Sequence, residues 1–325
     1  MRRSAASPAV EDDRLRFAED VEYYLSLSPR QLPSRYLYDD LGSALFEAIC
    51  HLPWYRITTI EQGMLERHAR EIVSRLAPLS TLIELGSGSG AKLATIVGAL
   101  EAPQRTTVHL VDVSASALAA ARRVLESDPR LTVVTHRTRY ESGLAEAAGS
   151  ARADGRALAL FLGSNIGNFD PPGADAFLHN LASALRPGDA LAIGADLVKP
   201  EPELLLAYDD PLGVTAAFNR NLLVRVNREL GADFDLQAFA HRAVWNAEAS
   251  RIEMHLVSER RQRVRIPAAR LDVTFDVGET IWTESSYKYR TDDLTAMLER
   301  AGFDVVSQWV EDGFMLTLAE ASVHP

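Results

Sequence analysis

Cysteine is nearly absent from this sequence, and long apolar runs are missing. Cys50 is the only cysteine in 325 residues, which excludes an internal disulfide and a zinc site built from several cysteines. The first residues include two arginines but no apolar segment of the kind found in signal peptides, and nowhere do about 18 apolar residues follow one another. We therefore expect a cytoplasmic protein with no membrane partner.

Basic residues are also in deficit. The chain has 34 lysines and arginines against 45 aspartates and glutamates, and its formal net charge is −11 at pH 7. Because domains that bind nucleic acids usually present a basic stripe, this balance argues against a nucleic-acid partner. Hydrophobic residues make up 47% of the chain, enough for a full core in one large or two ordinary domains. The sequence has no exposed-looking apolar stripe, so a monomer is expected.

Strand and helix patterns alternate through the first part of the chain. A helical pattern opens with a capping box formed by Thr59 and Gln62. Later helical patterns begin after Gly90, at the N-cap Ser114 and at the N-cap Asp170. The apolar strand-like segments between the helices cover residues 82–85, 108–111, 131–135, 157–162 and 190–193. Such repeated βα units predict a parallel sheet covered by helices on both faces.

The pattern changes after the fifth strand. Residues 218–230 have helical spacing and end at Gly231, while residues 252–256 and 271–277 alternate between apolar and polar side chains as half-buried antiparallel strands do. A helix from Thr291 and two final apolar strands are expected to complete the first sheet.

These patterns predict two domains. The α/β sheet is expected in residues 61–195 and 287–325, and a smaller inserted α+β domain, which would bind the substrate, in residues 1–60 and 196–286.

The segment TLIELGSGSGAKLATIV, from Thr81 to Val97, predicts a strand, a glycine turn and a helix. Two cofactor classes fit this turn. Gly86, Gly88 and Ala91 match the dinucleotide fingerprint G-x-G-x-x-G/A, which would indicate an NAD(P)-linked oxidoreductase. Alternatively, Glu84 together with Gly86, Gly88 and Gly90 gives E-x-G-x-G-x-G, the first motif of S-adenosylmethionine-dependent methyltransferases. Both interpretations place Asp112 at a strand end, where it would bind a ribose.

Three features favour the methyl donor: the acidic Glu84, the RPGD turn before the fifth strand, and the final antiparallel pair. The fold class is therefore predicted to be α/β with a Rossmann-like class I methyltransferase sheet. The fourth strand ends in FLGSNIGNFDP, and ligands lie at the carboxyl ends of strands in open α/β sheets. The other interpretation of this segment is an ordinary loop to a helix, with Asp170 as its N-cap.

Longer strings carry a more specific resemblance. With ELGSGSGAK and FLGSNIGN, the segments SRYLYDDLGSALFEAICHLPWY, AYDDPLGVTAAFNRNLLVRVNRELGADFDLQAFAH, RIEM and TESSYKYR resemble those of the histidine-specific Nα-methyltransferases of ergothioneine biosynthesis, which trimethylate L-histidine to hercynine. The resemblance covers roughly residues 33–318. It implies an enzyme with S-adenosyl-L-methionine as cofactor and L-histidine as substrate.

The resemblance also implies roles for particular residues. Asn168 and Tyr208 would hold the substrate's α-carboxylate, and Tyr38 would lie near its amine as the catalytic candidate. The residues expected on the imidazole side and in the pocket lining are Tyr55, Glu284, Ser286 and Met254. The residues expected to bind the cofactor are Gly86, Ser87, Gly88, Lys92, Asp112 and Tyr140. Glu284 and Ser286 are two apart on a strand-like segment and so share a face, whereas the tyrosines and Met254 taken singly fit ordinary core packing as well.

One position departs from the family pattern. The family has an acidic residue followed by phenylalanine on the adenine side of the donor, where this sequence has Arg139 and Tyr140. Arginine accepts no hydrogen bond, so Glu141 or a backbone carbonyl would have to substitute, or donor affinity would be reduced, or the local alignment is shifted. Alternatives to histidine methylation are an Nα-methyltransferase of tryptophan or another aromatic amino acid, and an inactive homologue that serves as an interaction module.

Overall fold

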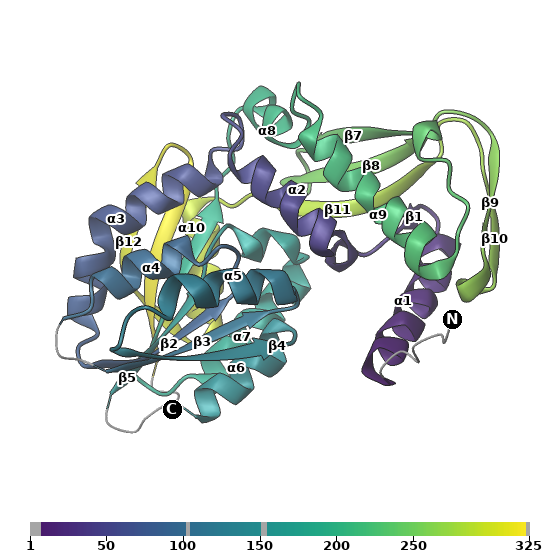
Figure 1. Ribbon diagram of the computed structural model, residues 1–325. Helices are drawn as coiled ribbons and strands as arrows, with labels where there is room; N and C mark the ends of the chain where they lie inside the picture. The colour runs from purple at the N-terminus through teal and green to yellow at the C-terminus, as the bar shows by residue number, and fades with distance from the viewer. Residues whose placement is uncertain (1–7, 102–104, 151–154, 323–325) are drawn as a thin grey trace. The chain divides into compact units, whose positions relative to one another are not determined.

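The computed structural model describes residues 8–101, 105–150 and 155–322, and its contacts divide the chain into two units (Figure 1). The large unit consists of the described parts of Tyr55–Pro200, Glu248–Arg251 and Ser286–Pro325. The small unit consists of the described parts of Met1–Trp54, Glu201–Ala247 and Ile252–Ser285.

The unit boundaries differ from those predicted. Residues 55–60, 196–200 and 248–251 and Ser286 belong to the large unit, because the elements around them pack there. Helix α3 (Ile57–Arg75) contacts α4 and β13, and Leu197 forms a β-bridge with Tyr289.

A seven-stranded sheet forms the centre of the large unit. Its order is β12 (Phe303–Glu311), β13 (Phe314–Ala321), β6 (Ala190–Asp196), β5 (Arg156–Phe161), β2 (Leu79–Leu85), β3 (Thr106–Asp112) and β4 (Leu131–Arg137). Numbered along the chain from β2 as strand 1 to β13 as strand 7, this order is 3-2-1-4-5-7-6 when read from β4. It is the order of the class I methyltransferase fold, so the predicted fold class is confirmed.

The pairing explains the apolar composition of the central strands. β2 pairs in parallel with β3 and β5, and every residue of β2 is buried. Burial of each Leu or Ile side chain contributes roughly 1.5–3 kcal/mol. The last two strands are antiparallel to each other, and β13 is also antiparallel to β6, as the sequence predicted.

Helices cover both faces of this sheet (Figure 1). On one face α3 contacts α4 (Ala91–Gly98), which contacts α5 (Ala115–Leu125). On the other face α6 (Tyr140–Gly149) contacts α7 (Pro171–Ala184), which contacts α10 (Thr291–Ala301). Ser114 and Asp170 accept hydrogen bonds from the backbone N–H groups of Ala117 and Gly173, so both predicted N-caps are confirmed.

The predicted capping box at Thr59 is wrong. Helix α3 begins earlier, because Arg56 already has helical backbone angles of φ −78° and ψ −11°. The Thr59 hydroxyl donates to the Arg56 carbonyl at 3.0 Å. The Gln62 amide donates to Glu66 at 3.0 Å and to Thr95 at 2.8 Å, so it does not return to an N-terminal N–H.

The small unit packs helices against a four-stranded sheet. The sheet order is β1 (Arg30–Gln31), β11 (Thr280–Tyr287), β8 (Arg251–Ser258) and β7 (Phe239–Asn246), and a separate pair joins β9 (Gln262–Ile266) to β10 (Leu271–Phe275). The α-helices are α1 (Pro8–Ser26), α2 (Asp40–Cys50), α8 (Glu201–Tyr208) and α9 (Val214–Leu230). The short 3-10 turns of the chain are η1 (Ser34–Leu37), η2 (Asn165–Asn168), η3 (Leu236–Ala238) and η4 (Pro267–Ala269). As predicted, α9 ends at Gly231, which has a left-handed φ of 70°.

Asp39 joins two of these helices. Its side chain caps α2 by accepting from the Gly42 N–H at 2.7 Å, and it also accepts from Asn221 and Arg228 of α9 at 2.7 Å each. These bonds hold the pKa of Asp39 below its ordinary value, although burial opposes them most strongly.

Two histidines contact each other on the neighbouring strands β3 and β4. His109 Nδ1 lies 2.9 Å from His136 Nε2, and His136 Nδ1 lies 2.8 Å from the Glu146 carboxylate. His109 is 3% exposed. Burial, together with the neighbouring His136, lowers the pKa of His109 to about 4.

This pair predicts a pH-dependent stability. Because the unfolded chain has a His pKa of about 6.5, it binds the proton more readily than the folded chain between about pH 6.5 and 4, so the free energy of unfolding falls as the pH falls through that window. The free energy of unfolding can be measured with urea at pH 7.5 and at pH 5.0. Over this fall in pH we expect it to drop by about 2 kcal/mol less in His109→Gln than in the wild type. His179→Gln, at an exposed position on α7, should behave as the wild type; equal losses in all three proteins would contradict the prediction.

Candidate functional site

The glycine turn follows β2 at the carboxyl edge of the large sheet. Gly86, Gly88 and Gly90 all have left-handed φ values, of 91°, 46° and 77°, a conformation that favours glycine. A Cβ at Gly90 would lie 2.7 Å from the Ala121 Cα, and one at Gly86 would lie 2.8 Å from Asn165 Nδ2. A Cβ at Gly88 would have no described atom within 4 Å. The turn is therefore closed by neighbours at its two ends and open at its middle.

Asp112 ends β3 beside this turn, as predicted. Its carboxylate accepts from the Ser114 N–H at 2.8 Å. Burial raises its pKa above the ordinary value, while hydrogen bonds from the backbone N–H groups of Ser114, Gly88 and Ser87 act in the opposite direction. The carboxylate thus ties the end of β3 to the glycine turn.

Two buried polar atoms in the turn have no hydrogen-bond partner among the described residues: Glu84 Oε2 and Ser87 Oγ. Glu84 is 3% exposed, and its burial raises its pKa well above the ordinary value; the nearby Lys92 opposes this rise, while Asp112 and Glu61 add to it. Unsatisfied buried polar groups cost free energy. Their presence at the turn is the pattern expected where a polar ligand binds.

Glu61 is the charged residue at this edge that the sequence analysis missed. It lies on α3 and is fully buried. Its carboxylate oxygens accept from the Gly163 N–H at 2.9 and 2.7 Å, and it forms an ion pair with Lys92 of α4. A Cβ at Gly194 of β6 would overlap this carboxylate. Glu61 therefore links four segments of the large unit and fixes the predicted cofactor residue Lys92.

In the loop after β5, the N-cap interpretation made from the sequence is confirmed. Asp170 is the N-cap of α7, and the loop also has an unusual backbone. Ser164 has a left-handed φ of 58° and its Oγ accepts from the Asp196 N–H at 2.9 Å. A Cβ at Gly167 would lie 2.7 Å from the Tyr287 carbonyl oxygen. Such strain is concentrated at functional sites. Asn168 is exposed at the end of η2.

Tyr140 is the first residue of α6 and reaches the glycine turn. Its hydroxyl would lie 3.3 Å from a Cβ at Gly86, and its ring packs edge-on against Phe161 and Phe177. Burial raises its pKa above the ordinary value. Arg139 is exposed at the N-cap of α6, where its side chain makes no capping bond. The Arg139 carbonyl accepts from Gly143 within the helix.

In the small unit, the predicted substrate residues lie on three different elements. Tyr208 is the last residue of α8, and its carbonyl accepts from His241. Met254 on β8 is 1% exposed, and Glu284 on β11 is 9% exposed. Tyr38 follows η1, and its ring lies 5.5 Å from those of Phe46 and Phe218.

The other predicted substrate residues belong to the large unit. They are Asn168, described above, Tyr55 and Ser286. Tyr55 is buried two residues before α3. Ser286 is buried on β11, and its Oγ accepts from Lys288 Nζ at 2.9 Å.

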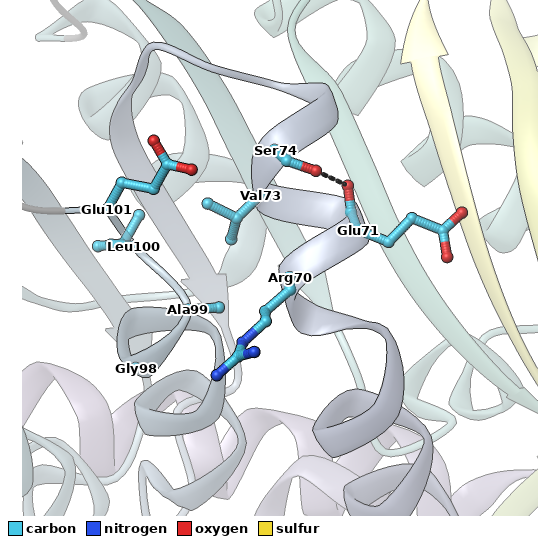
Figure 2. Close-up of a pocket in the computed structure, with 8 residues that line it drawn as sticks. All are labelled: Arg70, Glu71, Val73, Ser74, Gly98, Ala99, Leu100 and Glu101. Atoms are coloured by element: carbon cyan, nitrogen blue, oxygen red, sulfur yellow. Dashed lines mark hydrogen bonds between the residues drawn. The ribbon is translucent and has the colours of Figure 1, made fainter.

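A cavity of about 460 Å³ has none of these predicted site residues in its lining. Figure 2 shows the residues that line it. Its lining residues are Arg70, Glu71, Val73, Ser74, Gly98, Ala99, Leu100 and Glu101. This places it at the C-terminal end of α4, whereas the glycine turn precedes the N-terminus of the same helix. The helix is about 12 Å long at 1.5 Å per residue, so the cavity is separate from the turn. The Ser74 hydroxyl there is bonded within its own helix, to the Glu71 carbonyl.

Comparison with known proteins decides the family. The sequence profile of the family described as "Histidine-specific methyltransferase, SAM-dependent" matches residues 17–321. The chain belongs to this family. This confirms the resemblance found in the sequence motifs, and it favours the methyl-donor interpretation of the glycine turn over the dinucleotide interpretation.

Two mycobacterial relatives match this chain over nearly its whole length. Histidine N-alpha-methyltransferase of Mycobacterium tuberculosis is 42% identical to it, over 98% of this chain and 99% of that protein. The protein of the same name from Mycolicibacterium smegmatis is 41% identical, over 92% of this chain and 93% of its own length. Among solved structures, the CcbJ methyltransferase of Streptomyces caelestis has a TM-score of 0.42 and 14% identity, over 79% of this chain and 95% of that one.

Within the part of the chain that the structure describes, no helix has the length and apolar character needed to cross a membrane. The same residues contain no group of three or more His, Cys, Asp or Glu side chains placed to hold a metal ion.

Proposed function

We propose that the protein transfers methyl groups to the α-amino group of L-histidine, and repeats the transfer until the trimethylated product hercynine is formed. The observation that carries this proposal is the match of residues 17–321 to a histidine-specific family, with 42% identity across 98% of the chain to a protein named for that reaction. Both mycobacterial relatives are named for histidine, which favours histidine over tryptophan or another aromatic amino acid.

Two observations at the glycine turn support S-adenosylmethionine as the cofactor. When bound, this cofactor supplies a methyl group carried on a positively charged sulfur. The open position at Gly88 leaves room beside the backbone, and the buried Ser87 Oγ and Glu84 Oε2 are available for a polar ligand. We assign the ribose hydroxyls to Asp112 and the cofactor's carboxylate to Lys92. Gly86 and Tyr140 complete the proposed set.

For the substrate, the assignments follow the chemistry of each side chain. Asn168 and Tyr208 offer neutral donors to the α-carboxylate. Glu284 and Ser286 offer an acceptor and a hydroxyl to the two imidazole nitrogens, and Tyr55 and Met254 provide apolar surface for the ring. A plain indole lacks the second ring nitrogen, so Glu284 and Ser286 together suit histidine.

Each transfer requires alignment and the loss of one proton from the ammonium nitrogen, which makes three protons over the three transfers. The nucleophile is the neutral amine. The two donors to the substrate's carboxylate and the two contacts with its ring restrict the direction in which this amine approaches the methyl group. Correct alignment of reacting groups can contribute about 7–11 kcal/mol. We assign the proton acceptor to the Tyr38 hydroxyl or to water beside it. The ring of Tyr38 is held by edge contacts with Phe46 and Phe218, which fixes the direction of its hydroxyl.

The test is an incubation of the full chain with methyl-labelled S-adenosylmethionine and each of the twenty amino acids in turn. We expect label in histidine, with a final product that carries three methyl groups by mass spectrometry. Label in tryptophan but not histidine would overturn the substrate assignment. Donor binding without label in any amino acid would indicate an inactive homologue.

A second test concerns Asp112. Loss of hydrogen bonds between a carboxylate and ribose hydroxyls costs about 1.5–3 kcal/mol, so we expect Asp112→Ala to weaken binding of S-adenosylhomocysteine at least tenfold in calorimetry. Asp112→Asn keeps one acceptor oxygen and should lose less. Asp128→Ala removes a carboxylate that is bonded to Arg130 on the surface and serves as the control. Unchanged affinity in Asp112→Ala would remove this residue from the cofactor site.

A further inference from the structure

Lys288 is a buried cation that the function proposed above has not used. Its side chain is completely buried, and its Nζ lies 3.0 Å from the Asp196 carboxylate and 2.9 Å from Ser286 Oγ. Asp196 ends β6 and is itself 1% exposed. A buried lysine is tolerated when its charge is paired and its protons are accepted. Here one acceptor, Ser286, is a residue assigned to the substrate's ring.

Further contacts fix the ion pair between Lys288 and Asp196. The second carboxylate oxygen of Asp196 accepts from Lys199 Nζ at 2.6 Å, and the Asp196 N–H donates to Ser164 Oγ. The backbone N–H of Lys288 donates to the Ser250 carbonyl at 2.7 Å. The backbone and the charged end of Lys288 are thus both fixed within the large unit.

The contact with Lys288 dictates the direction of the Ser286 hydroxyl. An ammonium group has three donors and no acceptor, so Ser286 Oγ must accept from it. The serine hydroxyl has a single proton, which then points away from Lys288 and is donated to another acceptor. With Lys288 in place, Ser286 is a donor toward any ligand that it contacts.

We infer that Lys288 is a positioning residue that makes Ser286 a hydrogen-bond donor to the substrate's ring, so that the enzyme selects the neutral imidazole of histidine over the imidazolium. The inference rests on the proposed histidine methylation. Glu284 and Ser286 are two apart on β11 and both buried, so they share a face. Glu284 accepts from one ring N–H, and Ser286 donates to the other, unprotonated nitrogen. An imidazolium carries N–H groups at both nitrogens, and one of them would meet the Ser286 proton.

Other titratable groups lie on the elements next to Ser286 and Lys288. These are Asp196, Lys199, Arg251, Glu253, His255, Glu284, Tyr287 and Tyr289. Arg251 donates to the Tyr287 hydroxyl at 2.6 Å, and the Tyr289 hydroxyl donates to the Ile166 carbonyl at 3.1 Å. Lysine, arginine and tyrosine do not titrate between pH 5.5 and 7.5 at ordinary pKa values. His255, paired with Glu253 on β8, belongs to the residue type that does, so the experiment needs a reference substrate.

The experiment compares histidine with its triazole analogue, 1,2,4-triazolyl-3-alanine, whose ring stays neutral over this pH range. The ratio of KM for histidine to KM for the triazole cancels titrations of the enzyme and of the shared α-amine. For the wild type we expect this ratio to rise about tenfold from pH 7.5 to 5.5, because the neutral fraction of a ring with a pKa of about 6.5 falls by that factor.

Lys288→Met should reduce this rise to less than about threefold, because the released hydroxyl can rotate and accept from the second N–H of the imidazolium. Lys199→Met removes the other cation on Asp196 but keeps the contact between Lys288 and Ser286, so it should retain the tenfold rise. If Lys288→Met does not fold, Ser286→Ala serves in its place and should also flatten the ratio.

Each outcome has one meaning. A tenfold rise that persists in Lys288→Met or in Ser286→Ala overturns the inference, as does a flat ratio in the wild type. A flat ratio in these variants beside a tenfold rise in the wild type and in Lys199→Met supports it. If the wild type methylates neither substrate, the proposed function itself has failed, which is distinct from failure of the positioning role.

Discussion

Replacing Glu284 with alanine is expected to raise the KM for histidine by about ten- to one-hundred-and-fifty-fold, the equivalent of the 1.5–3 kcal/mol that a hydrogen bond to a charged group contributes. Affinity for S-adenosylhomocysteine should change less than about twofold, because Glu284 on β11 is assigned to the substrate's ring and not to the cofactor. Steady-state kinetics and calorimetry on the same preparations measure the two quantities.

Two further variants sharpen this prediction. Glu284→Gln keeps a carbonyl acceptor without the charge and should fall between the wild type and Glu284→Ala. Glu279→Ala removes a carboxylate just before the same strand, where it pairs with Arg30 at 2.7 Å, and should leave both constants unchanged. An equal loss of histidine and cofactor binding in Glu284→Ala would mean that the substitution disturbs the fold instead of the ring contact.

The second large effect is expected from Lys92→Met, which should destabilise the protein by about 3–5 kcal/mol. Removing one partner of a buried ion pair leaves the other charge uncompensated, and the side chain of Glu61 is 0% exposed. The free energy of unfolding in urea, measured without cofactor, tests this directly. The double variant Glu61→Gln/Lys92→Met removes both charges and should recover a large part of the loss.

A matched control is available on α3, the helix that carries Glu61. Arg67 of α3 pairs with Glu311 of β12, and both side chains are largely exposed, at 51% and 39%. Exposed pairs contribute about 0–1 kcal/mol, so Arg67→Met should cost less than about 1 kcal/mol. If Lys92→Met costs no more than Arg67→Met, then Glu61 does not depend on Lys92 for its burial, and the stabilising role of the pair is wrong.

Local chemistry explains why much of the fold could be predicted. Ser114 and Asp170 cap their helices and Gly231 ends another because these roles depend on residues within a few positions in the chain. The βα alternation gave the parallel strands for the same reason. The turn at E-x-G-x-G-x-G could likewise be predicted from the motif alone, since each of its glycines has the left-handed φ that favours glycine.

The failures of prediction are non-local. Glu61 resembles any solvated helix residue in the sequence, and only the packing of α3 beside Gly163, Lys92 and Gly194 buries it. Lys288 looks like one more charge in TESSYKYR, and only its ion pair with Asp196 at the end of β6 shows that it is buried and paired. Thr59 has the spacing of a capping box, but Arg56 extends the helix and leaves no cap position there. A buried charge is defined by its partner, and the partner is distant in sequence.

The backbone of β6 comes so close to Glu61 that position 194 has room only for glycine. A Cβ there would overlap the Glu61 carboxylate and lie 2.9 Å from Phe314 Cζ. The missing side chain is therefore part of the ion-pair site, because it leaves the volume in which the acid accepts from Gly163 and meets Lys92.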